Sequence, residues 1–411
     1  MVSKEQAAQI LSLSSEFNYD ISPTLKSLEE FDEVGEKWIK LAGEQFPELL
    51  YAAEEIVLYA KNLFRGSQRL NILNTSEEVL IMKGGGIKGL AYVGALEALG
   101  DTYKFNWFAG TSAGAITAVL LSAGYTIKEL KTILYDKDFK SFKDACYLKI
   151  PVNLWKHKGM YRGFSFEVWL NKLLSKKIDT ALQVKLHHLP KRATIYACTR
   201  DEPLIFDSTI IQNGGTGAAF AARCSMSIPY IFMPQMNQGV HVFDGGLKNN
   251  FPVELLLQHN PNANFLGLYL GDEHFVKKKN NVFLDVFRVF LESTEPNILE
   301  KYEKQIIVID PSPISTLKFR LNEVEKNFLL EAGRLAAIKF LSKRGLTDLE
   351  GHNYESRKTA LEKIRHTLKR KKKIRKFWFW TKIVLAVAGL IYCVTLWKIL
   401  AWVCISLASL L

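Results

Sequence analysis

Residues 79–89 read VLIMKGGGIKG, and this stretch decides the fold. The four apolar residues at 79–82 predict a short buried strand, and the three glycines that follow predict a tight loop. The next segment, 90–99, is rich in Leu and Ala and predicts a helix. A strand that passes through a glycine loop into a helix is typical of α/β proteins with parallel strands.

The glycine loop suits a negatively charged ligand group. Consecutive glycines let the backbone approach a ligand closely, and the N-terminus of the following helix favours negative charge. Gly84, Gly86 and Gly89 also fit the GxGxxG pattern of dinucleotide sites, which has many chance matches. That pattern requires an acidic residue about 20 positions later. Gly110 and Ser112 stand there instead, and a nucleotide-binding protein remains the alternative from another class.

A second glycine turn follows at 105–114, which reads FNWFAGTSAG. Gly110, Ser112 and Gly114 make a GxSxG motif between an apolar run and a helical segment at 115–123. In this setting a sharp turn exposes the serine Oγ at a helix N-terminus, and the flanking glycines relieve crowding. We therefore expect Ser112 to be a nucleophile.

The residue that would take the proton from this serine is less clear. None of the eight histidines stands in an obvious catalytic setting. The stretch 240–246, VHVFDGG, predicts a strand that ends in Asp244 on a glycine turn, and open parallel sheets place their chemistry at strand ends. Aspartate before glycine is also a common turn former, so both interpretations stay open at this point.

The three motifs, in this order, resemble the patatin-like phospholipase family. They are GGGIKG at 84–89, GTSAG at 110–114 and DGG at 244–246, with further likeness in SMSIP at 225–229 and NFP at 250–252. The resemblance covers residues 79–253, under half of the chain. It implies a three-layer α/β fold with helices around a mostly parallel sheet. It also implies a carboxylic ester hydrolase of the phospholipase A or lysophospholipase type.

Residue by residue, the resemblance implies a two-member site in which Ser112 is the nucleophile and Asp244 its base. The N–H groups of Gly84, Gly85 and Gly86 would form the oxyanion hole, and no metal or cofactor is implied. Because a free aspartate of pKa about 3.9 is a poor base for serine, Asp244 would need a dry pocket or a short hydrogen bond that forms in the transition state. The remaining motif positions are Lys88, which would add positive field, and Gly89, Gly110, Gly114, Gly245 and Gly246.

The charge of the chain lies almost entirely in its tail. The chain carries 54 Lys and Arg against 42 Asp and Glu, a net charge of +12. From Glu355 onward there are 13 basic and 2 acidic residues, a net of +11, which leaves 41 basic and 40 acidic residues, or +1, before it. After the basic run at 369–376 an apolar stretch continues to the last residue, and residues 383–397 carry no charge. This order predicts a single transmembrane anchor with the body on the cytoplasmic side. A helix lying flat in the membrane interface and a buried element of a soluble protein are the alternatives.

These observations divide the chain into five segments. We expect an N-terminal helical segment, a catalytic domain, a mostly helical C-terminal part of the body, a basic juxtamembrane segment and a membrane anchor, at residues 1–77, 78–255, 256–354, 355–376 and 377–411. The five cysteines show no CxxC spacing, so neither a disulfide framework nor a zinc site is predicted.

The sequence as a whole predicts a membrane-anchored serine acyl hydrolase that cleaves phospholipids through an acyl-enzyme. The expected partners are membrane phospholipid as substrate and an anionic lipid surface bound by the basic segment 363–376. A triacylglycerol or general lipid esterase is the nearest alternative, and a catalytically silent membrane scaffold is a more distant one. Nucleic acid is not expected, because the charge adjoins an apolar run without aromatic interleaving.

Overall fold

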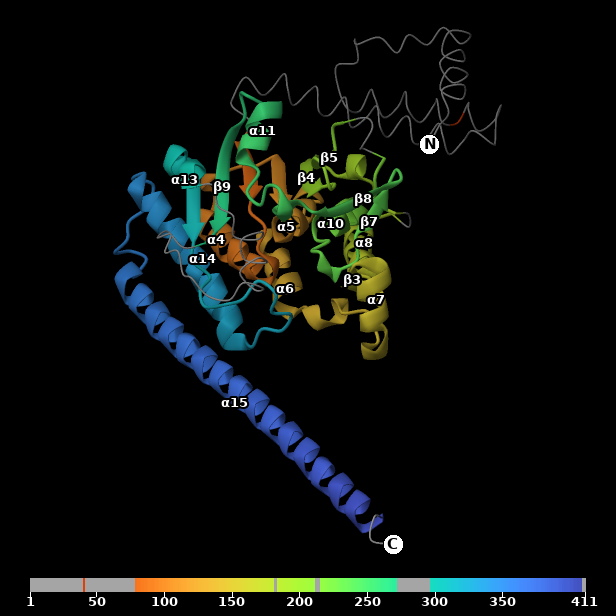
Figure 1. Ribbon diagram of the computed structural model, residues 1–411. Helices are drawn as coiled ribbons and strands as arrows, with labels where there is room; N and C mark the ends of the chain where they lie inside the picture. The colour runs from red at the N-terminus through yellow and green to blue at the C-terminus, as the bar shows by residue number, and fades with distance from the viewer. Residues whose placement is uncertain (1–39, 41–77, 181–182, 211–214, 272–295, 409–411) are drawn as a thin grey trace, which may run out of the picture.

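The computed structural model describes residue 40 and residues 78–180, 183–210, 215–271 and 296–408 (Figure 1). The predicted helical segment at 1–77 lies outside the described residues apart from Lys40.

The centre of the molecule is an eight-stranded sheet in the order β10-β9-β1-β2-β4-β8-β7, with β5 paired to β4. The five strands from β10 to β4 are parallel, and β5, β7 and β8 run antiparallel to their neighbours. The mostly parallel sheet that the sequence predicts is therefore confirmed. The strands are β1 Glu78–Met82, β2 Trp107–Thr111, β4 Arg192–Cys198, β5 Pro203–Asp207, β7 Gln235–Asn237, β8 Val240–Asp244, β9 Asn264–Leu270 and β10 Ile306–Ile309.

A second, two-stranded sheet pairs β3 (Gly159–Tyr161) with β6 (Tyr230–Phe232). Helices connect and cover the strands of both sheets. Their bounds are α4 Leu90–Leu99, α5 Ala113–Ser122, α6 Ile127–Asp136, α7 Ile150–His157, α8 Phe164–Ile178, α10 Ala218–Ser225, α11 Val253–His259, α13 Pro296–Lys301, α14 Glu323–Lys343 and α15 Tyr354–Ala408.

The large sheet is covered on both faces, which makes three layers (Figure 1). Alternate residues of β1 point to opposite faces, as the pleat of a strand requires. Leu80 and Met82 join a core with α4, α5 and α14. Val79 and Ile81 join a second core with α11 and α13. Burial on both sides explains why this strand is a continuous apolar run.

The segment 256–354, which we expect to be mostly helical, contains α13 and α14 and also two strands. It contributes two strands of the large sheet, and β9 pairs directly with β1, with Val79 opposite Phe265. The run NFLGLYL of β9 is itself apolar and fully covered, as a central parallel strand requires. The sheet that carries the site therefore continues beyond residue 255.

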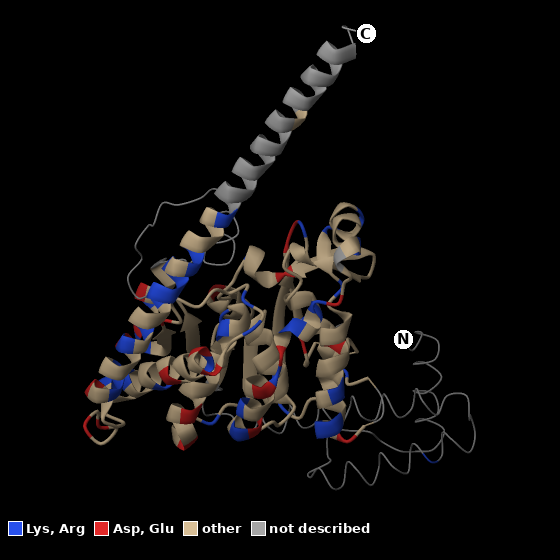
Figure 2. Ribbon diagram, turned by 90° about the horizontal axis from the view of Figure 1, so that it is seen from below, with Lys and Arg blue, Asp and Glu red and all other residues tan. Residues whose placement is uncertain are grey.

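Helix α15 begins against the body and continues beyond it (Figure 1). Leu361 and Leu368 are buried, and Arg365 forms an ion pair with Asp310. Lysines and arginines follow one another along this part of the helix (Figure 2). Among the residues that the structure describes, no helix combines the length and the apolar character needed to cross a bilayer. This finding gives no support to the transmembrane helix predicted at 377–411, and the side chains at 383–396 and 398–408 lie outside the described residues.

Candidate active site

Ser112 lies in the sharp turn between β2 and α5, where the GxSxG motif places it. Its φ of 52° and ψ of −113° are unusual for a residue with a side chain. Only glycine fits on either side. A Cβ at Gly110 would lie 2.4 Å from the carbonyl carbon of Gly114, and one at Gly114 would lie 2.2 Å from the carbonyl oxygen of Met82. The turn therefore depends on close backbone contact that the two glycines permit.

The backbone of Ser112 is held by a third element, α10. The Ser112 N–H donates to Ser225 Oγ at 2.8 Å, and the Ser225 hydroxyl donates to the Tyr196 carbonyl at 2.5 Å. Ser225 is the last residue of α10, and Tyr196 belongs to the neighbouring strand β4. The serine turn is thus tied to the sheet by one buried hydroxyl.

The glycine loop after β1 lies directly against the serine. The Gly84 N–H donates to the Asn250 carbonyl at 2.9 Å, and a Cβ on Gly84 would lie 3.4 Å from Ser112 Cβ. Gly86 has a φ of 55°, and a Cβ there would lie 2.4 Å from the Thr316 carbonyl oxygen. Within the described part of the chain, the N–H groups of Gly85 and Gly86 donate to no acceptor. They therefore remain available to a ligand, whereas the Gly84 N–H, which we expect in the oxyanion hole, is already bonded to Asn250.

Asp244 ends β8 and is fully buried. Its Oδ1 accepts the Gly246 N–H at 2.7 Å, whereas its Oδ2 is buried and receives no hydrogen bond from the described residues. Burial raises the pKa of this carboxyl group to about 7, and the Gly246 N–H and the Ser112 hydroxyl oppose the rise. The Ser112 side chain therefore lies close to the carboxyl group and favours its charged form.

Among the residues that the structure describes, no histidine is bonded to either group. Within the described residues, neither Ser112 nor Asp244 has a histidine among its hydrogen-bond or ionic partners. His187 packs edge-on against His188 with ring centroids 4.5 Å apart, and burial lowers the pKa of His188 to about 4. The arrangement brings a hydroxyl directly to a carboxyl group whose pKa is close to neutral, which suits proton transfer at physiological pH.

Three other glycines of the motifs lie where a side chain would be close to neighbouring atoms. A Cβ at Gly89 would lie 3.0 Å from Ala113 Cβ, and one at Gly245 would lie 2.4 Å from the Tyr196 carbonyl oxygen. A Cβ at Gly246 would lie 2.9 Å from Asp244 Oδ1. Lys88 is half-buried in the 3-10 helix Gly86–Gly89.

Arg223 is a buried residue of this region whose importance the sequence does not reveal. Its guanidinium donates to Ser227 Oγ at 2.7 Å and to the carbonyls of Met233, at 2.9 Å, and Arg162. The Ser227 carbonyl in turn accepts the Asp244 N–H at 3.0 Å. Arg223 therefore fixes the segment behind the carboxylate. It stands in an Ala-rich stretch of α10 that carries no local motif, so only its long-range contacts identify it.

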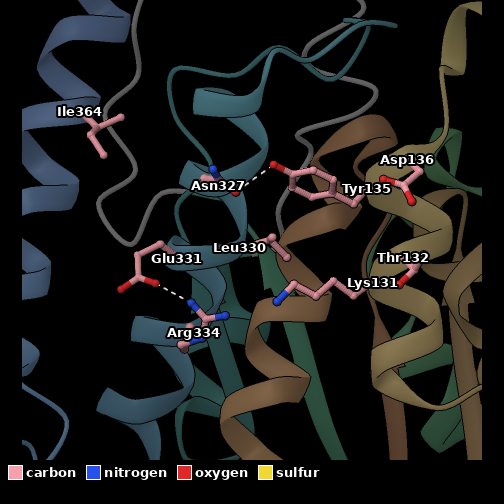
Figure 3. Close-up of a pocket in the computed structure, with 9 residues that line it drawn as sticks. All are labelled: Lys131, Thr132, Tyr135, Asp136, Asn327, Leu330, Glu331, Arg334 and Ile364. Atoms are coloured by element: carbon pink, nitrogen blue, oxygen red, sulfur yellow. Dashed lines mark hydrogen bonds and ion pairs between the residues drawn. The ribbon is translucent and has the colours of Figure 1, made fainter.

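A groove of about 620 Å³ opens elsewhere, between α6, α14 and α15 (Figure 3). Tyr135 donates to Asn327 Oδ1 at 3.1 Å across it, and Glu331 pairs with Arg334 at 2.6 Å. Charges of both signs line this groove, and none of its lining residues belongs to the three motifs. It is therefore separate from the site built around Ser112.

Comparison with known proteins shows similarity to one family model and to several relatives. The family model described as patatin-like phospholipase matches residues 80–257, which contain all three motifs. The YqhO protein of Bacillus subtilis is 28% identical over 283 residues, covering 64% of this chain and 97% of the relative. A probable lipid hydrolase of Invertebrate iridescent virus 6 is 23% identical, covering 62% of this chain and 86% of the relative. An intracellular phospholipase A2 of Caenorhabditis elegans is 25% identical, covering 47% of this chain and 19% of the relative.

Proposed function

Residues 80–257 form a patatin-like phospholipase domain, and from this premise we propose that Ser112 and Asp244 catalyse the hydrolysis of phospholipid acyl esters. The observation that carries the proposal is the meeting of two buried groups. Ser112 is held at a positive φ, and its hydroxyl lies close to the carboxyl group of Asp244. The Oδ2 of that carboxyl group is buried and unsatisfied within the described residues. A strained serine beside an unpaired buried carboxylate is costly for folding, so a catalytic role accounts for both features.

In the first step the Ser112 oxygen attacks the ester carbonyl carbon while Asp244 takes the hydroxyl proton. The raised pKa of about 7 makes this carboxylate a far better base than a solvated aspartate. The C–O bond to the leaving alcohol then breaks as Asp244 passes this proton to the departing oxygen. The fatty acyl group remains on Ser112 as an ester.

The glycine loop would stabilise the negative charge that develops on the carbonyl oxygen. Gly84 packs on Ser112, and the N–H groups of Gly85 and Gly86 are not used inside the described protein. Loss of one such donor typically lowers the rate about 10²- to 10³-fold. In the second step, water activated by Asp244 cleaves the acyl-enzyme and releases the fatty acid.

Phospholipid is the substrate class that we favour. The family model is described as a phospholipase, and one relative is named an intracellular phospholipase A2. The basic residues of 363–376 also suit a surface of anionic head groups. A triacylglycerol or other lipid ester is the alternative within the same chemistry.

The direct test is to incubate the purified full chain with vesicles of labelled phospholipid and to measure released fatty acid. Ser112→Ala and Asp244→Asn should each lose at least about 10³-fold in rate, because each removes a partner of the same proton transfer. Circular dichroism would check that both variants fold. Equal release by all three proteins would reject the catalytic pair.

We also propose that the C-terminal tail holds the catalytic body at a membrane. Support comes from the sequence, where the basic run at 369–376 adjoins an apolar stretch with tryptophans near both of its ends. By the positive-inside rule the body would then face the cytoplasm.

A further inference from the structure

Helix α7 and the turn before it carry large apolar side chains on their outer side. Leu148 is 87% exposed, Val152 50% and Trp155 82%. Their spacing of four and three residues places them along one helix face. On the other side of the helix, Asn153 is buried and its Nδ2 donates to the Met160 carbonyl at 3.0 Å. The helix therefore packs by one face and presents an apolar stripe to solvent with the other.

Tyr230 is a further exposed aromatic residue, and its backbone adjoins the end of the helix. Its side chain is 61% exposed, and its N–H donates to the carbonyl of Lys158, the residue that follows α7, at 3.0 Å. In the small sheet it pairs with Gly159. We call Leu148, Val152, Trp155 and Tyr230 together the α7 surface.

The charged side chains of the segment that carries α7 all have one sign. Residues 147–158 contain no acidic side chain, and Lys149, Lys156 and Lys158 are exposed. Trp and Tyr prefer the boundary between a bilayer and water, and lysine stems lie along apolar groups while their amines reach phosphates. This combination of an apolar stripe and a border of lysines is complementary to an anionic lipid surface. Contact with an acidic or a neutral face of a folded protein would not require both features together.

Short covalent and hydrogen-bonded links connect this surface to the candidate active site. Tyr230 follows five residues after Ser225, whose Oγ accepts the Ser112 N–H. The intervening Ser227 accepts the Asp244 N–H. In Figure 1, α7 lies at the lower edge of the body, the side toward which α15 projects. Docking through α7 would therefore hold the site next to a bilayer.

We propose that the α7 surface docks on the surface of anionic phospholipid bilayers. Docking would give the active site access to lipid substrate, and this role rests on the proposed function. The binding to the bilayer itself is independent of catalysis. Trp155 and Leu148 enter the interfacial region, and Lys149 and Lys156 meet the phosphates.

Fluorescence of Trp155 tests the docking locally, whatever the tail contributes to binding. The full chain with Ser112→Ala is mixed with vesicles of brominated phosphatidylcholine, with and without phosphatidylserine. The emission of Trp155 is taken as the difference from the same protein carrying Trp155→Phe. We expect this emission to shift to the blue and to fall by at least about half, more so with the anionic lipid. Trp155 emission that stays unchanged in both vesicle types would overturn the proposal.

Activity gives a second, independent readout. The double variant Leu148→Ser/Trp155→Ser should hydrolyse vesicle phospholipid roughly tenfold or more slowly than the wild type, because two apolar contacts with lipid are lost. Hydrolysis of a soluble short-chain ester should stay within about twofold. Val324→Ser is the matched control, since Val324 is 51% exposed on α14 and should change neither rate.

The remaining outcomes separate this proposal from its alternatives. Equal loss on both substrates would contradict a docking role. A lipid-free oligomer that dissociates in the double variant, measured by light scattering, would show that the surface binds another copy of the chain and would also overturn it. If the wild type hydrolyses neither substrate, the proposed function fails, and the quenching of Trp155 still decides the docking.

Discussion

At the scale of single residues, the environment of Asp244 determines its chemistry. The carboxyl group has one oxygen bound to the Gly246 N–H and the other buried without a partner. Water is excluded, so the charged form is disfavoured and the pKa rises to about 7. The sequence predicts that this residue needs a dry pocket, and the structure places it in one.

The first prediction concerns the pH dependence of activity. Because only ionised Asp244 accepts a proton, kcat/KM should rise with pH through an apparent pKa near 7 and level off above it. The profile would be measured with a soluble ester, so that lipid binding does not contribute. A rate that is already constant from about pH 5 upward would indicate an ordinary aspartate, with a pKa near 3.9, and contradict the role of burial.

The second prediction concerns stability. A carboxyl group whose folded pKa is raised stabilises the fold fully below its unfolded pKa, and this contribution is lost as pH rises through the folded pKa. For Asp244 the window runs from about pH 4 to about pH 7. Asp244→Asn removes the buried charge. As pH rises through this window, the free energy of unfolding of the variant should therefore increase relative to that of the wild type, on the order of 2–4 kcal/mol. Melting temperatures at pH 5 and pH 8 would measure it. A difference in stability between the variant and the wild type that is the same at pH 5 and at pH 8 would oppose the prediction.

At the scale of elements, two strand-to-helix turns bring the site together, and both could be predicted from local sequence. Glycines at fixed positions report backbone contacts that no other residue permits, so GGGIKG and GTSAG locate the turns without knowledge of the fold. The contributions of Ser225 and Arg223 could not be predicted in this way. Ser225 binds Ser112 and Arg223 binds the Arg162 carbonyl, and both partners lie far away in the sequence. The SMSIP stretch that begins at Ser225 marks a likeness to the family but does not indicate these partners.

The third prediction tests the serine turn. Gly114→Ala would place a Cβ 2.2 Å from the Met82 carbonyl oxygen, so β1 and α5 must separate. We expect a loss of about 1–3 kcal/mol or more in the free energy of unfolding, together with loss of activity. Chemical denaturation would measure it. Gly215→Ala is the matched control, because a Cβ there meets no atom within 4 Å. Similar effects of the two substitutions would contradict the contact that we describe.

At the scale of the whole molecule, the sheet is larger than the motifs suggest. β9 and β10 lie beyond the last motif, and β9 covers one edge of β1, the strand that precedes the glycine loop. Motifs report the residues of a site, whereas the strands that support it are recognised only by apolar runs. A run such as NFLGLYL is compatible with a buried helix as well as a strand, which is why the segment 256–354 was not predictable in detail.

The fourth prediction concerns the tail. Deletion of residues 377–411 should move the protein from an alkali-resistant membrane pellet to the supernatant, while hydrolysis of a soluble ester persists. The reason is that the described contacts of Ser112 and Asp244 all come from residues before 377. A variant with Lys371, Lys372 and Lys373 changed to Gln keeps the apolar stretch and should stay in the pellet. Retention of the deleted protein in the pellet would reject anchoring by the tail.

The central claim, that Ser112 is a nucleophile activated by Asp244, is tested most directly by covalent labelling. The full chain is treated with a fluorophosphonate, which reacts with activated serines, and the modified peptide is identified by mass spectrometry. We expect one adduct on Ser112, no adduct after Ser112→Ala, and labelling slowed at least about 10²-fold in Asp244→Asn. Undiminished labelling of the Ser112→Ala variant, or equal labelling rates with and without the Asp244 carboxylate, would contradict the claim.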